Sequence, residues 1–232
     1  MPILSAFGAA KTLGGPGASV APSNWSFVTA NDSARVTGTP YSQLAVAYDQ
    51  DYTVQFFIYL NSGTISTSYA IFNNGYAGSS LPAKGFYISV ESSGRIEFSL
   101  TSSYSISGPA ISRNQWVFVT ITRATKTLRM FYDTTEVAGP STSRSAISPT
   151  RCYIGNDGRF SSISGKVSNF RYLVGQGYTS ISSVPTSPLQ VVTNASVTKL
   201  LTLQDSTFID NSGNGMSLVG SGGASMTNVG PF

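Results

Sequence analysis

The sequence predicts an all-β protein, because two features recur along most of the chain from Trp25 onward. Hydrophobic residues alternate with polar ones at a period of two, which is the spacing of strands with one buried face. Short segments of this kind are separated by regular turn signals, which indicates a β-sandwich or a β-barrel. No long stretch of the chain has the periodicity of a helix.

Residues 1–20 are expected to form an extended N-terminal arm outside the β domain. The run Leu13–Gly17 is rich in glycine, contains a proline, and suits neither a helix nor a strand. One interpretation is a frayed terminus. The other is an anchor, in which the apolar residues Ile3, Leu4 and Phe7 become ordered against another subunit.

The clearest strand in the sequence is Thr53–Leu60, where the alternation is strict. One face of this strand carries only apolar residues: Val54, Phe56, Ile58 and Leu60. The opposite face carries Phe57 and Tyr59 among polar residues, so it too is expected to be partly covered.

A hairpin and a central strand are predicted next. Gly85–Val90 and Arg95–Leu100 are joined by the glycine-containing turn Glu91–Gly94, which is typical of a β-hairpin. Gln115–Arg123 is apolar on both faces and therefore predicts a central strand. After a turn the chain returns along Thr127–Tyr132, and a polar turn over residues 133–136 follows.

Two strands are predicted in the following part of the chain. Arg151–Gly155 is a short strand that contains Cys152. In Gly165–Val174 the apolar parity shifts between Val167 and Phe170, and such a shift indicates a β-bulge.

The C-terminal part is expected to complete the same domain. Residues 178–188 are rich in Ser, Thr and Pro and predict a long surface loop. Lys199–Gln204 and Met216–Val219 predict two final short strands. These are too short to fold alone, so residues 21–232 are assigned to a single domain.

Composition excludes several kinds of partner. Charged residues make up 10% of the chain, against about 25% in an average protein, and hydroxyl residues take their place. The net charge of +4 is dispersed rather than gathered in a stripe with stacking aromatics, so no nucleic-acid partner is expected. No apolar run approaches the ~18 residues of a membrane span, and the apolar start lacks the basic residues of a signal peptide.

The chain has no histidine and one cysteine, so several common catalytic systems cannot form. Histidine is absent, which removes the usual general base and the commonest zinc ligand. Cys152 is the only cysteine, so an intrachain disulfide is impossible and assembly in a reducing cytosol is favoured. We therefore expect no catalytic residue, no cofactor and no enzymatic activity.

Glycoside hydrolysis would need two carboxyl groups about 5–9.5 Å apart. Glu91 and Glu97 lie on either side of one turn, and they are expected to be solvated charges of the hairpin. Asp205 or Asp210 could approach Glu97 in space, so a hydrolase is disfavoured by the sequence rather than excluded.

Only weak candidates for calcium ligands are present. Asn156, Asp157 and Asp133 supply oxygen atoms near turns, but calcium takes six to eight oxygens and usually more than one carboxylate. Because Asn-Asp-Gly is also an ordinary turn sequence, the prediction is no metal, with Ca²⁺ as the alternative.

Ligand-binding residues are sought in loops, which carry function more often than strands do. Aromatic and amide side chains in stretches that look like loops are Tyr69, Asn73, Asn74, Tyr76 and Tyr104. Such side chains serve sugar binding and protein interfaces equally well, so they leave both kinds of partner open.

Six segments in the middle of the chain follow one another in a fairly specific order and spacing. They are Asp51–Tyr59, Gly85–Ile88, Asn114–Val119, Leu128–Tyr132, Tyr153–Gly155 and Gly165–Arg171. In this order they resemble the laminin-G-like, concanavalin A-like lectin/glucanase superfamily over roughly residues 45–175, with Phe57 where the family often has Trp. The resemblance implies an antiparallel β-sandwich, a concanavalin A-like jelly roll, formed by residues 21–232.

A narrower resemblance involves both ends of the chain. Its residues are Met1–Gly8, Pro185–Leu189, Leu200–Gln204, Phe208–Asn214 and Gly230–Phe232. These resemble laminin-G-like modules in structural proteins of marine and cyanobacterial phages. That resemblance implies a virion location after assembly in the host cytoplasm, with capsid or tail subunits as partners.

Three functions follow from these observations. The first is a non-enzymatic virion protein, either a capsid decoration (cement) protein or a head- or tail-fibre component, that acts through protein contacts. It is expected to be a homo-oligomer, with a trimer as the natural guess for a fibre. The second is a carbohydrate-binding, lectin-like module for attachment to host-surface glycan. The third is a glycan hydrolase.

Overall fold

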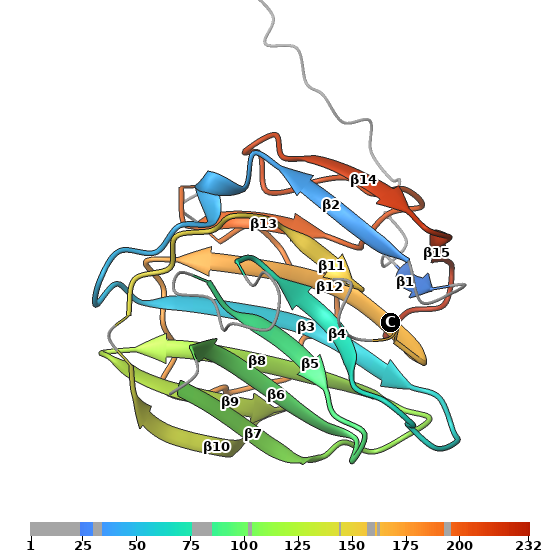
Figure 1. Ribbon diagram of the computed structural model, residues 1–232, viewed down its shortest axis with the longest axis horizontal. Coiled ribbons are helices and arrows are strands. Elements are labelled where there is room, and N and C mark those ends of the chain that lie inside the picture. Colours follow the sequence, from blue (N-terminus) through green and yellow to red (C-terminus); the bar gives the residue numbers. More distant parts are fainter. Residues whose placement is uncertain are drawn as a thin grey trace, which may run out of the picture.

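Two antiparallel β-sheets pack face to face in the computed structural model. The structure describes residues 24–29, 34–75, 85–101, 104–143, 145–156, 161, 163–192 and 196–232. Within these ranges the strands form one sheet of eight and one of seven (Figure 1). The predicted antiparallel β-sandwich is confirmed. The proposed arm residues Ile3, Leu4 and Phe7 lie outside the described residues.

The eight-stranded sheet is built around β3 and β12 at its centre. Its order is β10 (Thr135–Thr142), β9 (Thr127–Tyr132), β8 (Trp116–Ala124), β3 (Tyr52–Leu60), β12 (Gly165–Val174), β1 (Ser26–Thr29) and β15 (Ala224–Thr227), with β13 (Thr198–Thr202) also paired to β12.

The seven-stranded sheet covers one face of the first. Its order is β14 (Ser217–Ser221), β2 (Arg35–Thr39), β11 (Tyr153–Gly155), β4 (Tyr69–Asn73), β5 (Tyr87–Val90), β6 (Arg95–Thr101) and β7 (Tyr104–Ala110). The described residues also contain one 3-10 turn, η1 (Tyr41–Leu44), and no helix long and apolar enough to cross a bilayer.

Most of the predicted strands are confirmed, and the C-terminal strands join the same sandwich as expected. β13 pairs with β12 and β14 pairs with β2, so the last part of the chain extends both sheets. Several strand boundaries differ from those predicted. Cys152 precedes β11 rather than lying in it, and the turn after β9 is shorter because β10 already begins at Thr135.

Several strands had no clear signal in the sequence. β4 is buried on both faces and shows no alternation. β7 and β10 each contain a Gly-Pro pair, which reads as a turn although both strands lie at sheet edges, where proline is tolerated. β2 and β15 are short and consist mostly of small and polar residues.

The space between the sheets is filled mainly by aromatic rings. Fully buried rings in this core are Phe27, Tyr52, Phe56, Phe72, Phe86, Phe98, Phe170 and Tyr172. Phe72 packs against Phe170 across the two sheets, with ring centroids 4.9 Å apart. Contacts of this kind stabilise a fold beyond the burial of their area.

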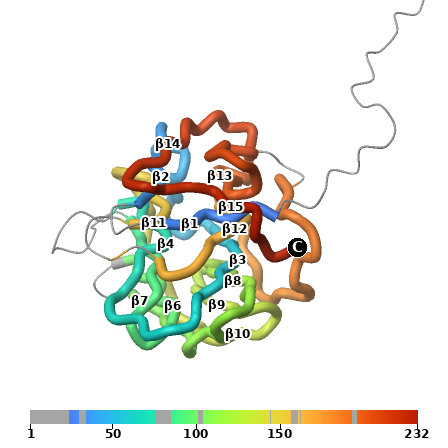
Figure 2. Tube along the Cα trace, turned by 90° about the vertical axis from the view of Figure 1, so that its right-hand side faces the viewer, coloured from blue at the N-terminus to red at the C-terminus, as the bar shows by residue number. Residues whose placement is uncertain are grey.

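A second hydrophobic layer covers the outer face of the eight-stranded sheet. Phe57 and Phe118 pack there against Leu189 and Leu201, and Phe232 stacks edge-on against Phe57. The chain after β12 runs along this face (Figure 2). The predicted coverage of the second face of β3 is therefore confirmed. The predicted surface loop contains no strand, but it covers apolar side chains of the sheet. We call the covering segment, residues 178–190, the roof.

A β-bulge in β12 fixes which side chains reach that outer face. Ser168 pairs with Phe57 and Arg171 pairs with Gln55, so two residues of β12 oppose the single residue between them on β3. Val167 before the bulge and Phe170 after it both face the core. The bulge predicted from this parity shift is confirmed.

Asn169 occupies the bulge and connects it to its surroundings. Its backbone is left-handed, with φ of 52°, and its side chain is fully buried. The Oδ1 atom accepts hydrogen bonds from the Leu189 backbone N–H (3.0 Å) and the Gln204 Nε2 (2.8 Å), and Nδ2 donates to Ser168 Oγ (2.9 Å). Asn169 thus attaches the roof to β12.

We expect Asn169→Ala to lower the free energy of unfolding by about 3–5 kcal/mol, because it leaves buried groups unpaired. Asn169→Gly removes the same hydrogen bonds but tolerates positive φ, so it should cost about 1 kcal/mol less. Urea unfolding of the two variants and the parent measures both quantities. Equal costs for Ala and Gly would show that the backbone at this position is not strained.

Candidate binding site

The candidate site is centred on Arg171 and Gln55, which are direct neighbours on the outer face of β12 and β3. Arg171 Nε donates to Gln55 Oε1 at 3.0 Å, and Nη2 donates to the same oxygen. Gln55 Nε2 in turn donates to Thr120 Oγ1 on β8 at 3.3 Å. Three adjacent strands therefore hold the guanidinium in one orientation.

Arg171 also contacts the roof, because its Nη1 donates to the Gln190 backbone oxygen at 2.6 Å. The other end of the roof is held where the Tyr178 backbone N–H donates to Thr122 Oγ1 at 2.9 Å. The segment between these attachments spans the sheet without a strand of its own.

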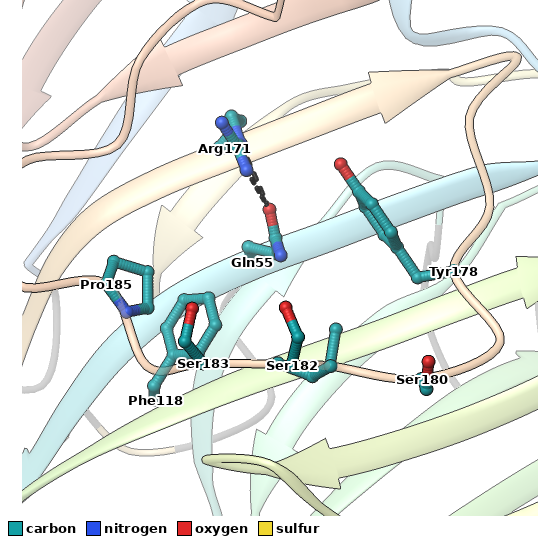
Figure 3. A pocket seen from close by; sticks show the side chains of 9 residues that line it. Gln55, Phe118, Arg171, Tyr178, Ser180, Ser182, Ser183 and Pro185 are labelled. Atoms are coloured by element: carbon teal, nitrogen blue, oxygen red, sulfur yellow. Dashed lines mark hydrogen bonds between the residues drawn. The ribbon is translucent and has the colours of Figure 1, made fainter.

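A cavity of about 290 Å³ lies between this segment and the sheet (Figure 3). Gln55, Phe118 and Arg171 form its floor. Its wall consists of Tyr178, Ser180, Ile181, Ser182, Ser183 and Pro185. Figure 3 shows the Tyr178 ring with its hydroxyl on the side of Arg171 and Gln55.

Among the residues that line the cavity, Arg171 alone is charged. None of the lining residues is acidic. Among the described residues, the ion pairs are Lys126–Asp49, Arg95–Glu91 and Arg129–Glu136, and none includes Arg171. Burial lowers the pKa of the Arg171 guanidinium, and the neighbouring Tyr178 raises it. A side chain of this kind can bind an anionic or oxygen-rich ligand.

The structure corrects the environment expected for the predicted ligand residues. Tyr69 and Asn73 lie in β4 and are buried, and Tyr104 begins β7, so the expectation of loops was wrong for all three. Asn74 follows β4 and is buried, and its Oδ1 accepts a hydrogen bond from the Phe86 N–H at 2.8 Å. Tyr76 lies outside the described residues.

The weak calcium candidates are not brought together by the described structure. Asn156 is buried after β11, whereas Asp133 Oδ1 accepts a hydrogen bond from the Phe118 N–H at 3.0 Å in the β9–β10 turn. Asp157 lies outside the described residues. Within the described ranges no three His, Cys, Asp or Glu side chains form a metal-binding group.

The acidic candidates have separate surroundings. Asp205 accepts a hydrogen bond from Asn211 Nδ2, and Asp210 accepts from the Met216 backbone N–H, so both organise the loop before β14. Glu97 was expected to be solvated, but it is half-buried. Burial raises the pKa of its carboxyl, the Glu91 carboxylate raises it further, and hydrogen bonding from Tyr87 lowers it.

The residues of the cavity were not identified from the sequence. Arg171 and Gln55 are far apart in the chain, and their pairing depends on the exact register of β12 against β3. The parity shift at the bulge was the one available signal, because it turns Arg171 from the core to the outer face.

Comparisons with known proteins agree with this fold. The family model described as concanavalin A-like lectin/glucanases superfamily matches residues 30–173. No curated protein matches the chain. Among solved structures, the native heptameric SAP-like pentraxin from Limulus polyphemus has a TM-score of 0.53 at 15% identity, over 89% of this chain and 95% of that one. This likeness concerns the fold alone.

Two further structures are similar over smaller parts. The botulinum neurotoxin serotype G binding domain has a TM-score of 0.49 at 12% identity, over 68% of this chain and 43% of that one. A mutant Trypanosoma rangeli sialidase displaying trans-sialidase activity has a TM-score of 0.44 at 14% identity. The alignment covers 56% of this chain and 22% of the sialidase.

We expect Glu97→Gln to raise the free energy of unfolding near neutral pH by up to about 1 kcal/mol, because the half-buried carboxylate disfavours folding there. Its folded-state pKa is raised, so the penalty grows as pH rises above the unfolded pKa of about 4.3 and is absent near pH 3. Urea unfolding at both pH values measures this. Glu136→Gln, which removes an acid paired with Arg129, is the control. An equal gain at both pH values would refute the explanation.

Proposed function

We propose that this chain, which belongs to the concanavalin A-like lectin/glucanases superfamily, is a non-enzymatic binding protein of a virus particle. Its role there would be capsid decoration or part of a head or tail fibre, after assembly in the host cytoplasm. The virion assignment is supported by the phage-like segments at both ends of the sequence. Binding through protein contacts is supported chiefly by the edge of the seven-stranded sheet at β14.

The β14 edge has the properties of a pairing surface. Among the described strands β14 pairs only with β2, so its other side is available to a partner. Val219 in this strand is 60% exposed. From Asn211 to Phe232 the sequence contains no charged residue. An uncharged edge without proline is a template for strand addition.

The opposite edges of the two sheets are protected instead. β7 contains Pro109, and β10 contains Pro140 together with the charged Glu136. Proline and charge are the usual means of preventing edge pairing. The contrast favours pairing at the uncharged edges, of which β14 carries the exposed Val219, over pairing at β7 or β10.

A second copy of the chain is the partner we propose for β14. Antiparallel pairing of one strand with its own copy has two-fold symmetry, so this contact gives a dimer. The trimer expected for a fibre would need a different, head-to-tail contact in place of this one, and the N-terminal arm is our candidate for it.

The absence of enzymatic activity is proposed from the side chains that the chain offers. Histidine is missing, and Asp205 and Asp210 accept hydrogen bonds in the loop before β14. Glu91 lies 3.9 Å from Arg95 Nε in an ion pair. A glycosidase would need one carboxyl as acid and a second as base or nucleophile.

Carbohydrate attachment is the second candidate function, and the Arg171 cavity is the observation that favours it. The cavity combines a fixed guanidinium with hydroxyl groups and the apolar side chains of Ile181 and Pro185, whereas most of the predicted loop residues are buried. Sites for small ligands commonly combine apolar surface with a few placed polar groups in this way.

The virion assignment predicts that peptides of this chain occur in density-gradient-purified particles from the source of the sequence. Quantitative mass spectrometry should find them at a fixed ratio to the major capsid protein, because decoration and fibre proteins occupy defined sites. Their loss from particles during purification, with recovery in the soluble fraction, would refute the assignment.

The edge contact predicts that the purified chain is a dimer in solution and that Val219→Lys makes it monomeric, because a lysine on an edge strand opposes pairing. Light scattering after size exclusion measures the mass of both. Tyr48→Lys is the matched control, since Tyr48 is also an exposed apolar residue, at 65% exposure, but lies in the turn before β3. A monomeric parent protein, or a dimer that survives Val219→Lys, would contradict the β14 contact.

A further inference from the structure

We propose that the cavity at Arg171 binds the carboxylate of an acidic sugar, a uronic acid residue of a polysaccharide. This inference deepens the second candidate function, carbohydrate binding, and rests on it. It is independent of the virion assignment and of the β14 contact.

The hydrogen-bonding capacity of Arg171 is only partly used. A guanidinium has five N–H groups. Three of them donate within the protein, from Nε and Nη2 to Gln55 and from Nη1 to Gln190. One N–H therefore remains on each Nη atom, and such a pair can hold the two oxygens of a carboxylate.

Arg123 shows what a purely structural arginine looks like in the same sheet. It is fully buried, and its guanidinium lies 4.8 Å from the centre of the Tyr52 ring. All three of its nitrogen atoms donate to backbone oxygens, and those oxygens belong to Ala47, Gln50 and Ser145. Arg123 is enclosed by its acceptors, whereas Arg171 lines an open cavity.

The charge of Arg171 gives a reason for an anionic ligand. Partial burial of a cation is unfavourable unless an opposite charge or sufficient hydrogen bonds offset it. Among the described residues no carboxylate forms an ion pair with Arg171, and none lines the cavity. A carboxylate from outside the chain would supply the missing charge in a fixed geometry.

The rest of the cavity favours a sugar ring as the carrier of that carboxylate. The volume of about 290 Å³ is near the lower end of the range for small-ligand sites. The hydroxyls of Ser182 and Ser183 turn toward the cavity in Figure 3 and can both donate to and accept from sugar hydroxyls. Ile181 and Pro185, which are partly exposed, provide apolar surface for the carbon–hydrogen face of a ring.

The test compares three small molecules in calorimetric titrations of the whole chain. Methyl glucuronide carries the carboxylate on a sugar ring, methyl glucoside lacks the carboxylate, and N-acetylaspartate carries both of its carboxylates on a peptide-like frame. We expect methyl glucuronide to bind with millimolar affinity and at least about tenfold more tightly than methyl glucoside. We also expect it to bind more tightly than N-acetylaspartate.

Variants locate the binding at the cavity. Arg171→Met should weaken methyl glucuronide binding by at least about tenfold, and Arg171→Lys should restore part of it, because lysine keeps the charge without the planar fork. Tyr178→Phe and Ser182→Ala change only partly buried or exposed groups, so they retain the fold and should weaken binding about two- to fivefold. Tyr48→Lys, in the exposed turn before β3, should bind as the parent does.

Three results would overturn the proposal. They are no heat of binding for methyl glucuronide at about 20 mM, equal binding of methyl glucoside, and unchanged binding after both Arg171→Met and Tyr178→Phe. Equal or tighter binding of N-acetylaspartate would overturn the sugar assignment in favour of a peptide carboxylate. Binding of neutral sugars that none of these variants affects would preserve the carbohydrate function and refute only this site.

Discussion

The β-bulge at Asn169 is the constraint on which the outer face of the eight-stranded sheet depends. Without the extra residue, strict alternation from Val167 would direct the Arg171 side chain into an apolar core and Phe170 out of it. The bulge reverses the parity, so Phe170 packs against Phe72 while Arg171 meets Gln55. One left-handed residue thus completes the core and creates the polar centre of the cavity.

Coverage of both faces of the eight-stranded sheet follows from the same arrangement. A sheet with Phe57 and Phe118 on its outer side needs an apolar cover, and the chain after β12 provides one through Leu189. Asn169 and Arg171 hold this cover by hydrogen bonds to backbone groups rather than by strand pairing. Because this segment is attached to the sheet at separate points, a space remains between it and the sheet, and that space is the cavity.

Local pattern was sufficient to predict the strands with strong alternation, including Thr53–Leu60 and the bulge in Gly165–Val174. It failed for β4, because a strand buried on both faces resembles an irregular apolar segment. It failed for the binding residues for a different reason. Tyr69 and Asn73 were assigned to loops from composition, whereas the cavity depends on cross-strand neighbours that only the register brings together.

The contrast between Arg123 and Arg171 is informative about function. Each guanidinium nitrogen atom of Arg123 donates a hydrogen bond to a backbone oxygen. This side chain therefore connects β8 to the turn before β3 and has a structural role. At Arg171 the protein fixes the orientation through Gln55 but leaves donors toward the cavity. A preorganised cation with donors to spare is suited to the recognition of a ligand.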